Sequence, residues 1–274
     1  MSRTTAWIAG LLACSLYALP ALAQTSMEGG ARAAALGGAA TALEGDAWGQ
    51  ANPAAWGTLP GRAVSFFASE GFGLEALRLG AVQYAEPTPF GAFAADVRTF
   101  GFEEYRETQG ALGYARRFAF DSTRTFALGL SVRYYQVTIE GFGNASTVGI
   151  SAGWLARVLP DVTVGFHATN LNRPELASRE ALPRTFALGL AYRPDARLQV
   201  LLDAYKDIDF PVSIRGGLEV LPVEALALRA GFTTQPTRFT TGVGVRLGRI
   251  AADVAAERHE TLGWTPGVAF GLRW

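Results

Sequence analysis

The fold is decided by the stretch Arg124-Thr125-Phe126-Ala127-Leu128-Gly129-Leu130-Ser131-Val132-Arg133-Tyr134, in which two kinds of residue alternate. Every second position carries a large apolar side chain, and the positions between carry small or charged ones. Successive side chains of a β-strand point to opposite faces, so a period of two indicates a strand with one apolar face. The stretch therefore predicts a strand. What its apolar face contacts, a protein core or lipid, has to be inferred from the rest of the chain.

The same alternation recurs along most of the chain. Together the alternating segments number about fourteen, an even number, as expected of a bacterial outer-membrane barrel. Besides 124–134, the predicted strands cover roughly 62–70, 74–85, 90–100, 108–118, 148–154, 162–166, 186–192, 198–202, 212–220, 226–232, 239–247, 250–254 and 264–274.

The positions between the large apolar residues show which face is which. They carry many Gly, Ala, Ser and Thr residues and only isolated charges. The water-facing side of a soluble sandwich would carry Lys and Glu freely, so we predict lipid outside and a crowded polar lumen inside. Five charged residues of this lumen lie on successive strands: Asp203, Arg215, Arg229, Arg246 and Asp253. We expect them to pair across strands or with Glu44 and Asp46, because unpaired charges in a partly dry lumen are costly.

The connections between the predicted strands alternate in length. One set is short and often contains Pro, as at 87–89, 159–161 and 193–195, and the other is more polar and in part longer: 101–108, 140–146, 170–183, 206–211 and 257–263. Outer-membrane barrels have short periplasmic turns and longer external loops, which places the C-terminus on the periplasmic side. The apolar parity also carries the aromatic residues expected of an interfacial girdle: Tyr134, Trp154, Tyr192, Trp264 and Trp274.

Composition excludes several classes of protein. The chain has 274 residues, of which 49% are hydrophobic and 18% charged, with no formal net charge and one Cys. The hydrophobic content excludes disorder, and the single Cys excludes a disulfide scaffold. A neutral charge balance argues against nucleic acid as a partner. Beyond the N-terminus no window of about 18 apolar residues occurs, which excludes a helical membrane protein.

The N-terminus is predicted to be a targeting segment. Residues 1–23 combine Arg3, an apolar run over 6–19 and the cleavage site Ala21-Leu22-Ala23, which together are typical of a secretory signal peptide. We predict cleavage after Ala23 and a mature protein in the outer membrane of a Gram-negative bacterium. The alternatives are a retained transmembrane helix and a lipoprotein signal that ends at Cys14.

Residues 24–60 differ from the predicted barrel, which covers 61–274. They are rich in Gly and Ala and lack the strand alternation. Asp46 is expected to cap a short helical turn that opens at Ala47, and Pro53 is expected to start a second one after Asn52. About fourteen strands enclose a lumen too wide for wall side chains to fill. We therefore predict that residues 24–60 form a hatch in the lumen, with Asp46, Asn52 and Pro53 as gating residues; the alternative is a flexible periplasmic tail.

Several motifs resemble those of a known group of barrels. The segments 30–32, 36–39 and 52–54, with Asp46, resemble the N-terminal signature of the PorV/PorQ group, and 182–194 and 226–232 look like its barrel segments. That group belongs to the FadL-type (long-chain fatty-acid transporter) superfamily. The resemblance implies a fourteen-stranded barrel with an internal N-terminal hatch. It implies either passage of hydrophobic small molecules or a role in type IX secretion.

Motifs that suggest catalysis fall in the wrong structural context. Gly149-Ile150-Ser151-Ala152-Gly153 matches the nucleophile elbow, but that motif requires a strand, a sharp turn and a helix, and Ser151 lies inside a predicted strand. The Gly-rich run 242–248 is not followed by a helix, so it does not predict a dinucleotide site. With His167 and His259 as the only histidines and no Cys in the mature chain, we expect no metal, no cofactor and no catalytic residues.

Three functions remain as hypotheses. The first is a hatch-gated channel for hydrophobic or small solutes, for which Phe66 or Phe67, Phe72, Phe100, Phe102 and Phe142 would line an apolar site near the external rim. The second is a secretion-associated or scaffold barrel that binds an exported or partner protein. The third is an outer-membrane enzyme with a Ser–His site. The expected partners are outer-membrane lipid, and either a hydrophobic ligand or a secretion-system protein.

Overall fold

The computed structural model describes residues 30–176 and 180–274. The predicted signal peptide, its cleavage site and Cys14 lie outside the described residues. Among the residues described, no helix is long and apolar enough to cross a membrane.

Fourteen antiparallel strands form a closed barrel, which confirms the predicted fold class. Neighbours in the chain are neighbours in the barrel, except that β7 pairs with β10 across a longer connection. The strands are β1 (Ala63–Glu70), β2 (Arg78–Thr88), β3 (Gly91–Gly101), β4 (Tyr105–Ala119), β5 (Thr125–Ile139), β6 (Gly143–Leu159), β7 (Val162–Ala168), β10 (Thr185–Tyr192), β11 (Leu198–Asp207), β12 (Ser213–Val223), β13 (Leu226–Thr234), β14 (Thr237–Leu247), β15 (Ile250–His259) and β16 (Gly263–Arg273).

The barrel closes where its first and last strands meet. β1 pairs with β16 in antiparallel register, with Ala63 opposite Arg273. The backbone N–H of Arg62 donates to the carbonyl of Trp274 at 2.9 Å, and the N–H of Trp274 donates to the carbonyl of Arg62 at 3.1 Å. Closure leaves the barrel without a free sheet edge at this seam.

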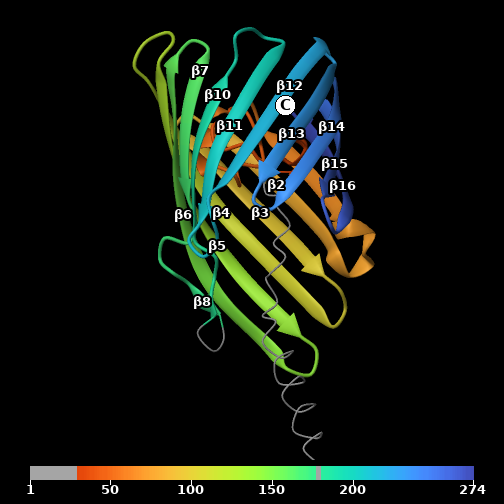
Figure 1. Cartoon of the computed structure of the whole chain (residues 1–274). Helices are drawn as coiled ribbons and strands as arrows, with labels where there is room; N and C mark the ends of the chain where they lie inside the picture. The colour runs from red at the N-terminus through yellow and green to blue at the C-terminus, as the bar shows by residue number, and fades with distance from the viewer. Residues whose placement is uncertain (1–29, 177–179) are drawn as a thin grey trace, which may run out of the picture.

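The two ends of the barrel differ (Figure 1). The end that holds the C-terminus, called here the turn end, carries the short connections 89–90, 120–124, 160–161, 193–197, 224–225 and 248–249. The opposite end, called the loop end, carries the connection 169–184, which contains the two-residue strands β8 (Glu175–Leu176) and β9 (Glu180–Ala181). Long strands β4 to β6 reach furthest toward the loop end in Figure 1.

Three expectations about connections and strand ends were wrong. The predicted strand 74–85 starts late, because two 3-10 turns, η3 (Gly71–Gly73) and η4 (Glu75–Leu77), precede β2. The polar connections 101–108 and 140–146 are shorter than expected, because β4 and β6 continue through them: Tyr105 pairs with Ile139, and Ile139 with Gly143. For the same reason Tyr134 lies inside β5, away from the predicted end of a strand.

Side-chain burial alternates along the strands as the sequence predicts. In β14 the buried residues Thr240, Gly242 and Gly244 alternate with Val243 and Val245, which are exposed on the outer surface. The exposed outward positions of other strands are likewise large and apolar, among them Val200, Ile214 and Phe270. The outer surface is therefore an apolar band of the kind that faces lipid in membrane-spanning barrels.

Aromatic side chains gather on the outer surface toward the turn end. Trp154 lies between Phe126 and Phe166, with ring centroids 6.2 Å from each. Tyr84 and Trp274 lie across the closing seam, 6.5 Å apart. Rings of this kind favour the boundary between an apolar layer and water, so they mark one border of the apolar band.

Residues 30–60, called here the N-terminal segment, lie inside the barrel, where Figure 1 shows them in orange. The segment contains a helix, α2 (Gly30–Ala35), and a 3-10 helix, η2 (Pro53–Thr58). Pro53 starts η2 as predicted, with Asn52 as the N-cap. The expectation that Asp46 caps a helical turn was wrong: residues 46–49 form no helix, and the helix in the first part of the segment is α2 instead.

The facing of β14 is testable with single cysteines in lipid nanodiscs. Val243→Cys is expected to resist a charged maleimide, because its side chain faces the apolar layer. Arg246→Cys, three residues along the same strand, is expected to react readily, because position 246 lines a cavity at the turn end. Equal labelling rates at the two positions would overturn the assigned facing.

Candidate functional site

The N-terminal segment packs against a wall of inward-facing glycines. A Cβ added to any of eight of them would lie under 3.0 Å from an atom of the segment, closer than real Cβ atoms come. One such glycine stands on each of eight strands: Gly113, Gly129, Gly153, Gly165, Gly189, Gly217, Gly231 and Gly242. Here the wall contributes backbone in place of side chains, so the segment and the barrel are in direct contact.

Polar contacts fix the segment at defined points of the wall. The backbone N–H of Thr41 donates to Asp203 Oδ2 at 2.9 Å. The side-chain amide of Asn52 donates to the carbonyl of Thr41 at 2.7 Å and to that of Trp154, on β6, at 3.0 Å. Its oxygen accepts from the N–H of Ala54 at 3.0 Å. One buried amide thus holds two parts of the segment and one strand together, which gives Asn52 a larger role than Pro53.

Further along the wall, two threonines hold the first part of the segment. Thr233 Oγ1 donates to the carbonyl of Gly37 at 2.9 Å, and Thr240 Oγ1 donates to the carbonyl of Ala35 at 2.9 Å. Both carbonyls belong to the end of α2 or follow it directly, where helix carbonyls lack partners within the helix. The wall therefore completes the hydrogen bonding of a helix too short to be stable alone.

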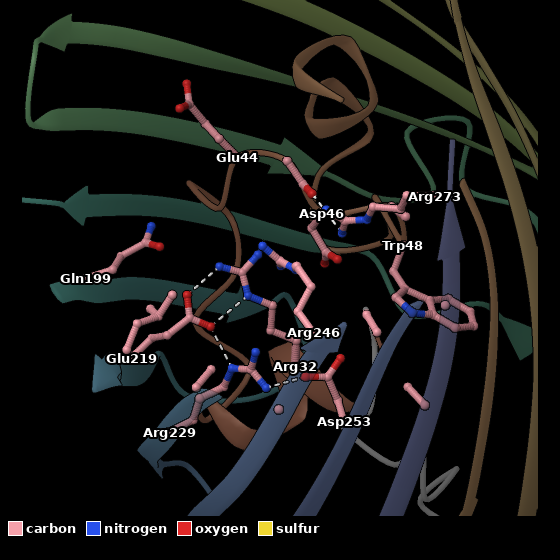
Figure 2. Close-up of a pocket in the computed structure, with 18 of the residues that line it drawn as sticks. Arg32, Glu44, Asp46, Trp48, Gln199, Glu219, Arg229, Arg246, Asp253 and Arg273 are labelled. Atoms are coloured by element: carbon pink, nitrogen blue, oxygen red, sulfur yellow. Dashed lines mark hydrogen bonds and ion pairs between the residues drawn. The ribbon is translucent and has the colours of Figure 1, made fainter. Parts of the chain in front are cut away.

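A network of charges lies in the lumen at the turn-end side of the N-terminal segment. Glu219 on β12 accepts from two arginines: Arg32 of the segment, at 2.9 and 2.6 Å, and Arg229 of β13, at 2.6 Å. Arg229 also donates to Asp253 of β15 at 2.6 Å. Figure 2 shows these ion pairs as a chain that runs from the segment to three strands. Charge-assisted bonds of this kind are stronger than neutral ones, so the chain ties the segment to the wall.

The five predicted lumen charges divide into two groups. Arg229, Asp253 and Arg246 line one cavity at the turn end. Asp203 and Arg215 are register partners nearer the loop end, where Asp203 binds Thr41 and the guanidinium of Arg215 lies 3.5 Å from the ring centroid of Tyr205. The structure therefore does not bring all five together.

The expected partners of the network also differ from what the structure has. Glu44 pairs with Arg157 of β6, a residue outside the predicted set. Asp46 is buried, and burial raises the pKa of its carboxyl while the nearby Arg32 and Arg273 lower it. Its backbone partner is Trp48, whose ring closes over Gly30.

The cavity at the turn end, called here the chamber, has a volume of about 520 Å³. It lies between the N-terminal segment and strands β11 to β16, with Ser65 of β1 and Arg157 of β6 also in its lining, and that lining is rich in charge (Figure 2). Six arginines contribute to it: Arg32, Arg157, Arg193, Arg229, Arg246 and Arg273. Its carboxylates are Glu44, Asp46, Glu219, Glu224 and Asp253.

Sequence reasoning missed Arg32, Arg273 and the pairing of Glu219 as parts of this site. Arg273 and Glu219 share the inward parity of their strands, so the alternation contains a signal for both. Arg32 has none, because its partner Glu219 lies 187 residues away and no periodic pattern connects them.

The remaining candidate residues have simpler positions. Ser151 is buried on the lumen face of β6, as its predicted place inside a strand requires, and His167 is buried on β7. Within the described ranges, no group of three or more potential metal ligands comes together. Of the phenylalanines expected at the rim, Phe67 packs on Trp48 at 5.9 Å, Phe66 faces outward, and Phe100 borders a second cavity of about 560 Å³ toward the loop end.

The glycine wall makes a matched pair of substitutions informative. Gly113→Ala places a methyl group against the ring of Trp56 and is expected to lower the free energy of unfolding by about 1–3 kcal/mol. Gly110→Ala, on the same strand, meets nothing closer than 3.9 Å and is expected to leave it unchanged. Urea unfolding in lipid vesicles measures both, and equal stabilities would contradict the close packing.

The ion network can be tested with a second matched pair of substitutions. Arg229→Ala leaves Asp253 without its arginine and Glu219 with Arg32 alone, so we expect a loss of about 2–3 kcal/mol in the free energy of unfolding. Arg246→Ala, which removes the same charge from the neighbouring strand without breaking an ion pair of the described residues, is expected to cost much less. A loss of similar size in the two variants would show that the network does not stabilise the barrel.

Comparison with known proteins places the chain by fold. No family model matches it, and no curated protein sequence does. It is similar to the toluene transporter TbuX of Ralstonia pickettii, with a TM-score of 0.65 and 12% identity over 90% of this chain and 99% of that one. The toluene transporter TodX of Pseudomonas putida gives 0.61 and 13% over 88% and 96%.

A FadL homologue of Pseudomonas aeruginosa gives a TM-score of 0.56 and 13% identity over 90% of this chain and 96% of that one. At these identities the likeness is one of fold. The chain is thus a closed fourteen-stranded barrel, with the fold of FadL-type outer-membrane transporters.

Proposed function

We propose that the protein is an outer-membrane channel for small, mainly hydrophobic solutes, closed at rest by its N-terminal segment, which acts as a hatch. The observation that carries the proposal is the contact between that segment and the glycine wall. A lumen filled to backbone contact lets no solute pass, so a channel of this fold has to move the segment.

The outer surface supports the location. The exposed positions of the strands are apolar, and aromatic rings border them toward the turn end. Apolar surface of this extent is unusual on a monomer in water, and it is the surface that lipid covers on membrane barrels. The similarity in fold to TbuX, TodX and a FadL homologue supports the same location.

The solute class rests on the same similarity and on the loop-end cavity. TbuX and TodX are toluene transporters. In this chain the cavity of about 560 Å³ is lined by Phe100 and Leu79, by Pro266 and Val268 on the outward side of β16, and by the charged residues Glu70, Arg78 and Arg106 at its border. Its volume suits a small molecule.

The contacts of Asn52 and Thr41 are part of what opening has to break, together with the ion pair between Arg32 and Glu219. The hatch is held to β6 through the carbonyl of Trp154 and to β11 through Asp203. A net contribution of about 1 kcal/mol for each such bond leaves the closed state favoured and still reversible. Ligand or partner contacts that replace these bonds would release the segment.

A second candidate function follows from the resemblance to the PorV/PorQ group, namely the binding of an exported or partner protein. One observation favours it. Among the described residues, β6 pairs with β7 only from Ala152 onward, so its part nearer the loop end has β5 alone as a strand neighbour. Asn172 and Leu171 bond the backbone of Val148 and Ile150, so the open part of this edge is 143–147, and a partial edge is a template for an added strand. Gentle purification followed by mass spectrometry separates the two candidates, because one predicts a bound small molecule and the other a bound polypeptide.

The channel proposal is tested by removing the hatch. Deletion of residues 26–58 is expected to leave a barrel that assembles, because the strands carry the lipid-facing surface. In planar bilayers this barrel should conduct ions better than the full-length protein. A deletion variant that assembles and conducts no better than the intact protein would remove the hatch as the barrier.

A point substitution supports the same test without a deletion. Asn52→Ala loses three hydrogen bonds inside the lumen, and we expect a conductance between those of the intact and deleted proteins. Asn172→Ala is the matched control, because Asn172 bonds the edge of β6 at the loop end and does not touch the hatch. Its conductance is expected to equal that of the unmodified protein.

A further inference from the structure

The chamber at the turn end holds arginines that its own carboxylates do not neutralise. Glu219 and Asp253 are bonded to Arg32 and Arg229, and Glu44 is bonded to Arg157. The other three arginines of the chamber, Arg193, Arg246 and Arg273, form no ion pair with a carboxylate of residues 30–176 or 180–274.

The hydrogen bonds of these three arginines, where they form any, go to neutral acceptors. Arg193 donates to the side-chain oxygen of Gln199 at 2.9 Å, and Arg273 donates to the carbonyl of Gly45 at 3.3 Å. Arg246 has no side-chain hydrogen bond to a described residue, and it is exposed to solvent. Their charges are therefore available to a bound ligand.

The arginines also face one another. Figure 2 shows Arg32, Arg246 and Arg273 directed into the same chamber, where Arg273 is attracted by Asp46 and repelled by Arg246 and Arg32. Like charges held together in a partly enclosed space are unfavourable without a counter-ion. Two carboxylates of the chamber stand outside the ion pairs, and against six arginines they leave a surplus of positive charge: Asp46, which is buried near Arg32 and Arg273, and the exposed Glu224.

The size and the uncharged lining of the chamber indicate which class of anion could act as the counter-ion of these arginines. The chamber has about 520 Å³, far more than a simple inorganic ion needs. Its uncharged lining includes Trp48, Leu198, Ala227 and Ala251, which offer apolar contact beside the guanidinium groups. A cavity with an apolar lining and a few convergent charged donors is the usual form of a site for a small organic molecule. Guanidinium groups match the planar shape of a carboxylate.

We propose that the chamber is a binding site for a small organic carboxylate, held by Arg246 and Arg273 with Arg193 at its border. The inference goes beyond the channel function, because it concerns equilibrium binding at the turn end and needs no movement of the hatch. Failure of either proposal therefore leaves the other standing.

The test uses the full mature protein in neutral detergent and equilibrium dialysis with radiolabelled benzoate. Benzamide, which has nearly the same shape without the charge, is the paired probe. We expect the protein to retain benzoate and not benzamide. Arg246→Gln is expected to weaken benzoate binding by about tenfold or more, since it removes a charge-assisted bond to the carboxylate.

Arg249→Gln is the matched control. Arg249 lies on the turn directly after β14, carries the same charge and does not line the chamber, so this variant is expected to bind benzoate like the unmodified protein. Arg246 makes no contact on which folding depends, and an unchanged unfolding midpoint of the variant confirms that it is folded. Absence of benzoate binding, equal retention of benzamide, or equal weakening by the two substitutions would each overturn the site.

Discussion

Contact of backbone with backbone across the lumen is the constraint on which the structure depends. Residues 30–60 contain few large side chains, and the wall opposite them offers glycine on eight strands. The segment depends on the wall, because α2 is six residues long and too short to be stable alone. The glycine-rich inner face of the strands would have little to pack against without the segment, although their lipid-facing surface still holds the barrel together. Together they make a dense interior in which small residues replace the large apolar core of a soluble protein.

The charges of the lumen follow from that packing. With the segment seated, Arg32 of α2 reaches Glu219, and the carboxylate then bridges to Arg229 and Asp253. Had the segment been absent, Glu219 would face a wide aqueous lumen. The same seating leaves the space at the turn end open, and there the arginines outnumber the carboxylates that can bind them. Packing by small residues therefore determines both where the lumen is filled and where it is charged.

Much of the barrel was predictable from sequence, because a period of two survives wherever one face meets lipid. Val243 and Gly242 illustrate how plainly the two faces differ. Strand ends were not predictable at the loop end. There the strands extend beyond the apolar band, and their polar sequences, such as that at the start of β6, look like those of loops. The position of Asp46 was mistaken for a helix cap because the contacts that shape residues 40–50 come from the wall. Arg32 and Glu219 were beyond any local pattern for the same reason.

The distribution of glycine around the lumen also divides the wall mechanically. From β4 to β14, most strands meet the segment with backbone atoms, which cannot rotate out of the way. In the remaining arc, β15 and β16 meet it with alanines such as Ala255 and Ala269. Strands β1 and β2 meet it with Phe67, Leu79 and Gln83, whose side chains can change rotamer. One arc is thus stiff and the other compliant. A segment confined in this way meets the least resistance on the side of β1 and β2, next to the seam where the first and last strands of the barrel join.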